Sequence, residues 1–142
     1  MTEKTSFKPG TMVNPVPVAM VSCGTMETKN IITIAWTGIV NSEPPLAYIS
    51  VRKSRHSHGL IAANGEFVIN LCTERLAFAA DWCGVKSGRD VDKFAEQKLT
   101  ALPAKLVGCP LIAEAPVNIE CRVREVREYP SHDMFVAEVL QV

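Results

Sequence analysis

Residues 50–58 carry a cluster of basic side chains that could bind an anion. The segment reads SVRKSRHSH and contains no acid. Its cationic or protonatable side chains are Arg52, Lys53, Arg55, His56 and His58. We expect it to join a strand to the start of a helix, where the helix dipole disfavours each cation by about 0.3–1 kcal/mol. An anion held by the helix N–H groups, the arginines and the hydroxyls of Ser54 and Ser57 would offset that cost. The alternative is a solvated basic face.

A second segment, residues 30–37, could form one wall of a site for a flat aromatic ligand. It reads NIITIAWT, so small or hydroxyl side chains (Thr33, Ala35, Thr37) alternate with large apolar ones. A flat ligand needs an apolar face, close backbone approach and hydrogen-bonding groups at its polar edge. The alternative is an ordinary strand with its threonines in water and Trp36 in the core.

The cysteines and histidines favour packing over chemistry. The five cysteines are Cys23, Cys72, Cys83, Cys109 and Cys121. Their spacing contains no CxxC pair, so neither a zinc ribbon nor a thioredoxin-like motif is present. We expect small, reduced, buried side chains, which disfavours thiol catalysis assisted by His56, His58 or His132. His56 and His58 point in different directions if both lie in the first turn of a helix, so no metal site is expected.

Composition indicates one ordinary globular domain spanning residues 1–142. Hydrophobic residues make up 47% of the chain and charged residues 21%, which excludes a disordered tail, a collagen-like repeat and a coiled coil. A formal net charge of zero and only 6% aromatic residues argue against a nucleic-acid binder. The sequence offers neither a signal-peptide pattern nor an apolar run long enough for a membrane span, so we expect a cytoplasmic protein.

The elements that must position these residues are mostly strands. The expected strands are residues 17–23, 31–36, 46–51, 66–72, 117–124 and 134–142. The expected helices are residues 54–64 with Ser54 as N-cap and Gly65 as its stop, residues 74–83 with Thr73 as N-cap, and a short helix or turn at 93–99. Residues 1–15 are expected to form an arm, and the prolines of residues 41–45 indicate a break between strands. Apolar and polar residues alternate along the strand at 117–124, and Val126 does not fit this alternation, which indicates a bulge at residues 124–125. The pattern predicts an all-β barrel with two or three short helices. Either a strand ends the fold at Val142 or a natural C-terminus is missing.

Taken together, these segments resemble a known family. The segments that carry the resemblance are residues 17–23, 30–36, 38–40, 44–57, 64–71 and the loop SGRDVDKF at 87–94. In this order and spacing, over about residues 12–142, the chain resembles the flavin reductase-like proteins of the FMN-binding split-barrel superfamily, especially the flavoredoxin type. The resemblance implies a mainly β fold, an antiparallel, Greek-key-like split barrel, in a homodimer that binds FMN non-covalently. It also implies that relatives continue past residue 142.

The resemblance further implies which residues hold the cofactor. Asn30, Thr33, Ile34, Ala35 and Trp36 would line the isoalloxazine and ribityl groups, continued by Ser50, Val51 and Arg52. Arg55, His56 and Ser57 would hold the phosphate. Lys93 and Phe94 would cover the flavin or the phosphate, either within the same subunit or from the second subunit of the dimer. No catalytic residue and no metal is expected, because FMN itself carries the redox chemistry.

The function expected from the resemblance is an FMN-dependent oxidoreductase. Either FMN is a tightly held cofactor that passes electrons from NAD(P)H, or from a redox protein, to a small-molecule or protein acceptor, or FMN is itself a substrate that is reduced and released. The alternative is a non-enzymatic, flavoredoxin-like electron carrier without a nicotinamide site. No nucleic-acid or membrane partner is expected.

Overall fold

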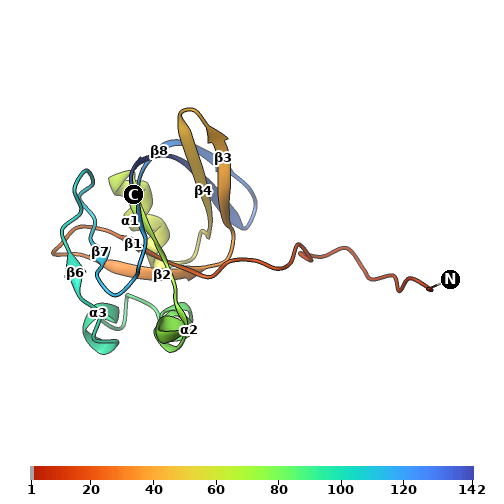
Figure 1. Ribbon diagram of the computed structural model, residues 1–142, viewed down its shortest axis with the longest axis horizontal. Coiled ribbons are helices and arrows are strands. Elements are labelled where there is room, and N and C mark those ends of the chain that lie inside the picture. Colours follow the sequence, from red (N-terminus) through yellow and green to blue (C-terminus); the bar gives the residue numbers. More distant parts are fainter. Residues whose placement is uncertain (1) are drawn as a thin grey trace.

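The computed structural model describes residues 2–142 and shows a curled, antiparallel sheet that forms a split barrel (Figure 1). The seven strands run in the order β2-β1-β5-β8-β9-β4-β3. Their bounds are β1 (Ala19–Cys23), β2 (Asn30–Ile34), β3 (Thr37–Ser42), β4 (Pro45–Arg52), β5 (Glu66–Leu71), β8 (Asn118–Glu128) and β9 (His132–Gln141). Two short strands, β6 (Ala101–Leu102) and β7 (Leu111–Ile112), pair with each other. The expected mainly β fold is confirmed.

Strand β1 and most of its neighbour β5 are buried on both faces. In β1, Ala19, Val21 and Cys23 point into the barrel core, whereas Met20 packs against the helices outside it. This explains why residues 17–23 read as a continuous apolar run rather than an alternating one. In β8 the expected bulge is confirmed, because the register with β9 shifts between Val123 and Glu125.

Three α-helices and one 3₁₀ turn accompany the sheet in residues 2–142. They are α1 (His56–Asn64), η1 (Glu74–Leu76), α2 (Ala77–Val85) and α3 (Lys93–Glu96). Helix α1 inserts Ile61 into the barrel core and ends at Gly65, whose φ of 67° suits glycine. Helices α2 and α3 cover the outer face of β1 and β2, where Phe94 and Ala80 pack beside Met20.

The expected helix starts are wrong in detail. Arg55, not Ser54, is the N-cap of α1, and no side chain among residues 2–142 caps that helix. The predicted helix at residues 74–83 is instead the η1 turn followed by α2, which extends to Val85. A serine before a helix predicts a cap only when its backbone turns at that residue, and here the chain turns one residue later.

Two parts of the sheet do not follow from the sequence pattern. Residues 41–45 were predicted to be a break, but Asn41 and Ser42 belong to β3 and Pro45 begins β4. The sheet tolerates these prolines because β3 is an edge strand and Pro45 is the first residue of its strand. The short strands β6 and β7 were not predicted, since two residues carry no periodic signal.

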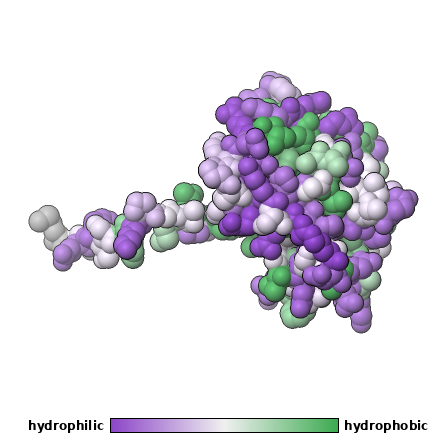
Figure 2. All heavy atoms as spheres, turned by 180° about the vertical axis from the view of Figure 1, so that it is seen from behind, coloured by the Kyte–Doolittle hydropathy of each residue, from purple (hydrophilic) through white to green (hydrophobic). Residues whose placement is uncertain are grey.

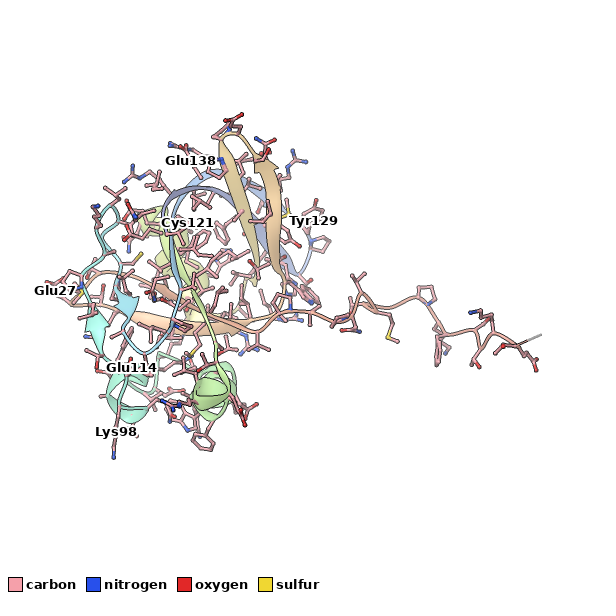
Figure 3. All side chains as sticks on the ribbon, viewed as in Figure 1. Glu27, Lys98, Glu114, Cys121, Tyr129 and Glu138 are labelled. Carbon is pink, nitrogen blue, oxygen red and sulfur yellow. The ribbon has the colours of Figure 1, made fainter. Side chains whose placement is uncertain are left out.

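The expected arm is confirmed for the part that the structure describes. Residues 2–18 are exposed, and the arm runs outward from the barrel (Figures 1 and 2). In Figure 3, Cys121 lies within the barrel, Lys98 and Glu114 mark the end near α3, and Glu138 lies at the opposite end of the molecule.

Candidate functional site

A basic pocket opens where β2, the start of α1 and the end of α2 meet. Its volume is about 330 Å³, within the range of small-ligand sites. Its positively charged or protonatable lining residues are Arg52, Arg55, His56, Lys86, Arg89 and Lys93. No aspartate or glutamate of residues 2–142 lines it. A concentration of cations without countercharge is the arrangement expected for a multivalent anion.

The start of α1 adds backbone donors to this pocket. The helix has neither a capping side chain nor an acid in its first turn, as judged over the described residues. Its first N–H groups therefore lack the partner that a capped helix provides, and the positive end of the helix dipole lies beside the arginines. Ser57 is buried in this turn and accepts a 2.8 Å hydrogen bond from the side-chain amide of Asn30 on β2. The two predicted segments, 30–37 and 50–58, thus meet at this contact.

Two cations of the pocket come from a loop that the sequence reasoning did not assign to the site. Lys86 and Arg89 follow helix α2, and Arg89 donates from Nη1 to the backbone oxygen of Ser54 at 3.3 Å. Gly88 lies directly against Asn30, since a Cβ there would come within 2.3 Å of the Asn30 Oδ1. Two features of the sequence could have indicated that this loop belongs to the site: residues 84–92 are polar, and residues 87–94 resemble a loop of the family named above.

Lys93 lines the pocket but is already engaged by the protein. Its Nζ donates to the backbone oxygens of Ile31 at 2.7 Å and Cys83 at 2.6 Å. Burial lowers the pKa of this ammonium from its ordinary value, and the nearby Arg55 lowers it further. Phe94, which was predicted to cover the flavin or phosphate, lines neither this pocket nor the next. It is buried in the cluster between α2, α3 and β1, where it supports the helix that carries Lys93.

A second pocket continues from the first and has a different character. This Trp36 pocket has a volume of about 240 Å³. Its lining residues are Ile32, Thr33, Ile34, Ala35, Trp36, Ser50, Val51, Arg52, Arg55 and His132. Ile32, Arg52 and Arg55 line both pockets, so the two form one elongated site with a strongly basic end and an end lined by Trp36, His132 and aliphatic side chains.

His132 is a lining residue that sequence reasoning considered only as a base for a thiol. Its ring lies 4.7 Å from that of Trp36, with the planes inclined at 38°. Burial lowers the pKa of His132, and the positive charge of Arg52 lowers it further. His132 begins β9 opposite Arg52 of β4, a pairing that brings residues 80 positions apart to the same pocket. Only its position in the turn YPSHD hinted at a role.

The predicted donor face of residues 30–37 is partly used by the protein itself. Thr33 donates to the backbone oxygen of Ala80 at 2.5 Å, and Thr37 donates to that of Tyr48 at 2.8 Å. Strand β2 ends at Ile34 and β3 begins at Thr37, so Ala35 and Trp36 form a break between strands. The Trp36 pocket is therefore built on an interrupted strand, not on a continuous alternating one.

The cysteines have the properties of packed side chains. All five are free, and all but Cys72 are buried. Burial raises the pKa of Cys23 to about 11 and those of Cys109 and Cys121 to about 12. A raised pKa keeps a thiol protonated and poorly nucleophilic. Residues 2–142 show no group of His, Cys, Asp or Glu arranged to hold a metal ion, and no helix with the length and apolarity of a bilayer span.

Comparison with known proteins agrees with this architecture. The family model described as a flavin reductase like domain matches residues 12–142. The chain belongs to the flavin reductase-like family. Flavoredoxin from Methanosarcina acetivorans superposes with a TM-score of 0.91 at 31% identity, covering 99% of this chain and 74% of flavoredoxin.

Two sequence relatives of this family extend the comparison. An uncharacterized protein of Archaeoglobus fulgidus is 34% identical over 117 residues, which are 82% of this chain and 66% of the relative. A Stutzerimonas stutzeri protein named FMN reductase (NADH) RutF is 26% identical over 103 residues, 72% of this chain and 57% of that protein. The chain thus spans about two thirds or less of these relatives' length.

Proposed function

We propose that the elongated site binds FMN, with the phosphate in the basic pocket and the isoalloxazine ring in the Trp36 pocket. One observation carries this proposal: a pocket lined by five lysine or arginine side chains is continuous with a pocket lined by Trp36 and His132. The residues we assign to FMN are Asn30, Thr33, Ile34, Ala35, Trp36, Ser50, Val51, Arg52, Arg55, His56, Ser57 and Lys93. The pockets add Lys86, Arg89 and His132 to that set.

The chain's own groups fit the two ends of this cofactor. Arg52 and Arg55 present forked donors, and the uncapped start of α1 presents N–H groups, both of which suit a phosphate dianion. Asn30 and Ser57, bonded to each other, line the basic pocket. Trp36 and His132 supply two neighbouring aromatic rings against which a flavin ring could pack. FMN supplies the hydride or one-electron chemistry, while the protein binds and orients it.

The reaction that we propose is electron transfer from NAD(P)H or a redox protein to an acceptor. Membership of the flavin reductase-like family and the relative named FMN reductase (NADH) support an enzyme. The similarity to flavoredoxin supports the second candidate, an electron carrier without a nicotinamide site. We propose that the single domain works as a cytoplasmic homodimer, as the family resemblance implies.

The acceptor's route is suggested by a third pocket beside Trp36. This arm pocket, of about 390 Å³, shares Ala35 and Trp36 with the Trp36 pocket of the FMN site. Its other lining residues are Thr11, Val13, Pro15, Val16, Pro17, Thr37 and Tyr48. The lining includes no lysine, arginine, aspartate or glutamate of the described chain, so it favours an uncharged, apolar acceptor.

Anaerobic addition of NADH or NADPH to the FMN-loaded protein tests the reaction. If the protein is a reductase, either nucleotide bleaches the flavin absorption in a saturable manner. If the protein is a carrier, neither nucleotide does, although a chemical reductant such as dithionite still bleaches the bound flavin. Bleaching that is no faster than with free FMN at the same concentration would contradict the reductase.

A further inference from the structure

Asp133 is a buried carboxylate directly beneath the corner that carries the phosphate-binding side chains. It is the second residue of β9 and is 6% exposed. In the sheet it pairs with Val51 of β4, and its neighbour His132 pairs with Arg52. The chain then turns from β4 into α1 through residues 52–57, which we call the 52–57 corner. A carboxylate rarely stays buried unless it is paired.

The carboxylate of Asp133 contacts two side chains, Lys53 and His58, which precede and follow Arg55 in the chain. Its Oδ2 lies 2.6 Å from the Nε2 of His58, in the first turn of α1. Its Oδ1 lies 3.4 Å from the Nζ of Lys53 and makes no hydrogen bond within residues 2–142. The His58 ring also packs against Phe135, with the ring centroids 5.4 Å apart. Asp133 therefore ties β9 to the corner at two points, one before and one after Arg55.

Neither partner lines the basic pocket or the Trp36 pocket. Lys53 and His58 therefore do not reach the proposed phosphate from the positions seen here, whereas Arg55, His56 and Ser57, which lie between them, do. A negative charge beneath a phosphate site would weaken anion binding through space, unless its partners balance it. The arrangement fits a mechanical role better than an electrostatic one.

We propose that Asp133 is a positioning residue that holds the 52–57 corner, through His58 and Lys53, in the conformation that binds the cofactor's phosphate. This inference rests on the proposed FMN site. According to this inference, the preference for FMN over riboflavin depends on Asp133, although Asp133 lines neither pocket of the FMN site. We expect its effect mainly at the phosphate end, because Lys53 and His58 flank residues 54–57 of the basic pocket, whereas residues 33–36 of the Trp36 pocket lie on β2 and in the break that follows it.

The same contacts give Asp133 a defined pH dependence. Burial raises the pKa of Asp133, but the His58 hydrogen bond and the Lys53 charge outweigh it and lower the pKa below its ordinary value. Positioning is therefore complete above about pH 4, the ordinary aspartate pKa, and is lost as the pH falls through the lowered value. The other charged or titratable groups near this carboxylate are Arg52 on β4, His132 on β9 and Glu128 of β8, which pairs with Asp133 and lies 3.5 Å from Lys53.

The test is the affinity of the apoprotein for FMN and for riboflavin, measured by flavin fluorescence. Asp133→Asn keeps the side-chain shape but removes the charge that holds both partners. It should weaken FMN binding about tenfold, the scale of one charged hydrogen bond, and change riboflavin binding less than twofold. His58→Phe, which keeps a ring beside Phe135, should do the same. The double variant should bind FMN no more weakly than Asp133→Asn alone, because the His58 contact is already weakened in that variant.

Two further variants keep the test decisive. Glu138→Gln removes another carboxylate of β9. Glu138 forms an ion pair of 2.5 Å with Arg124 and does not contact the 52–57 corner, so this variant should leave both affinities unchanged. If Asp133→Asn does not fold, Lys53→Met at the partly exposed end of the contact should still lower FMN affinity selectively. Equal losses of FMN and riboflavin affinity in the Asp133, His58 and Lys53 variants, or no loss of FMN affinity in all three, would overturn the positioning role. Failure of the unaltered protein to bind FMN would instead overturn the proposed function.

Discussion

Arg55 lies at the junction of the two pockets, and we expect phosphate recognition to depend on it more than on any other residue. It lines both pockets and occupies the N-cap of α1 without a side-chain cap in the described chain. Replacing Arg55 by Ala should weaken FMN binding by about 1.5–3 kcal/mol, the range for a hydrogen bond to a charged group. Riboflavin, which lacks the phosphate, should lose little. Isothermal titration of both flavins checks this, and equal losses would remove Arg55 from the phosphate site.

Ala35 tests the opposite end of the site. It lies in the break between β2 and β3 and lines both the Trp36 pocket and the arm pocket. A leucine there fills space that the ring needs, so Ala35→Leu should weaken FMN and riboflavin binding alike. Thr33→Leu is a less direct probe, because it also breaks the bond to Ala80. Unchanged affinity of the Ala35→Leu protein for both flavins would place the ring elsewhere.

The sequence predicted those residues of the candidate site that lie in two contiguous segments, and missed residues that come from elsewhere in the chain. The basic residues of 50–58 and the residues of 30–36 are each contiguous in the chain, so their types alone indicated a site. Arg89 and His132 reach the pockets only because α2 packs on β2 and because β9 pairs with β4. No local pattern encodes those contacts. Phe94, the neighbour of the pocket residue Lys93, is buried in the core and lines neither pocket of its own chain.

The loop that follows α2 must approach β2 closely for the basic pocket to form. Gly88 allows this, because Asn30 is held by Ser57 and cannot move away from an added Cβ. Gly88→Ala should displace the loop with Arg89 and lower FMN affinity about tenfold, the effect of losing roughly one charged hydrogen bond. Gly59→Ala is the matched control: nothing lies within 4 Å of its added Cβ, and it should stabilise α1 by about 0.5–1 kcal/mol. Equal FMN affinity in both variants would show that the loop does not shape the site.

The elements themselves were predictable to different degrees. Strands β1, β4, β5 and β9 follow from β-rich runs bounded by turn residues, and strand β8 from the alternation of apolar and polar residues, as predicted. Helix α1 follows from its apolar residues and its stop at Gly65. Strand β3 was missed because the prolines after it indicated a break, whereas the sheet places them at an edge and at a strand start. The start of α1 was missed by one residue, and that residue matters because it leaves Arg55, not a capping serine, at the helix end.

Three pockets of the molecule are connected through shared lining residues. The basic pocket is continuous with the Trp36 pocket, which in turn borders the arm pocket. Val16 of the arm lines the third pocket, whereas Val18, two residues further on, does not. Val16→Asp should lower kcat/KM for an uncharged acceptor such as 1,4-benzoquinone about tenfold, the effect of roughly 1.4 kcal/mol of apolar contact. FMN affinity should stay the same, and Val18→Asp should behave as the unaltered protein. A loss in Val18→Asp as large as in Val16→Asp would show a general effect of charge on the arm.

We propose that this split barrel holds FMN in the site that runs from the 52–57 corner to Trp36. The most direct test is the visible absorption of the purified protein after incubation with FMN and removal of free flavin by desalting. We predict flavin bands that survive desalting at one FMN per chain, and far less retention of riboflavin. A protein that keeps neither flavin, or that keeps riboflavin as well as FMN, would contradict it.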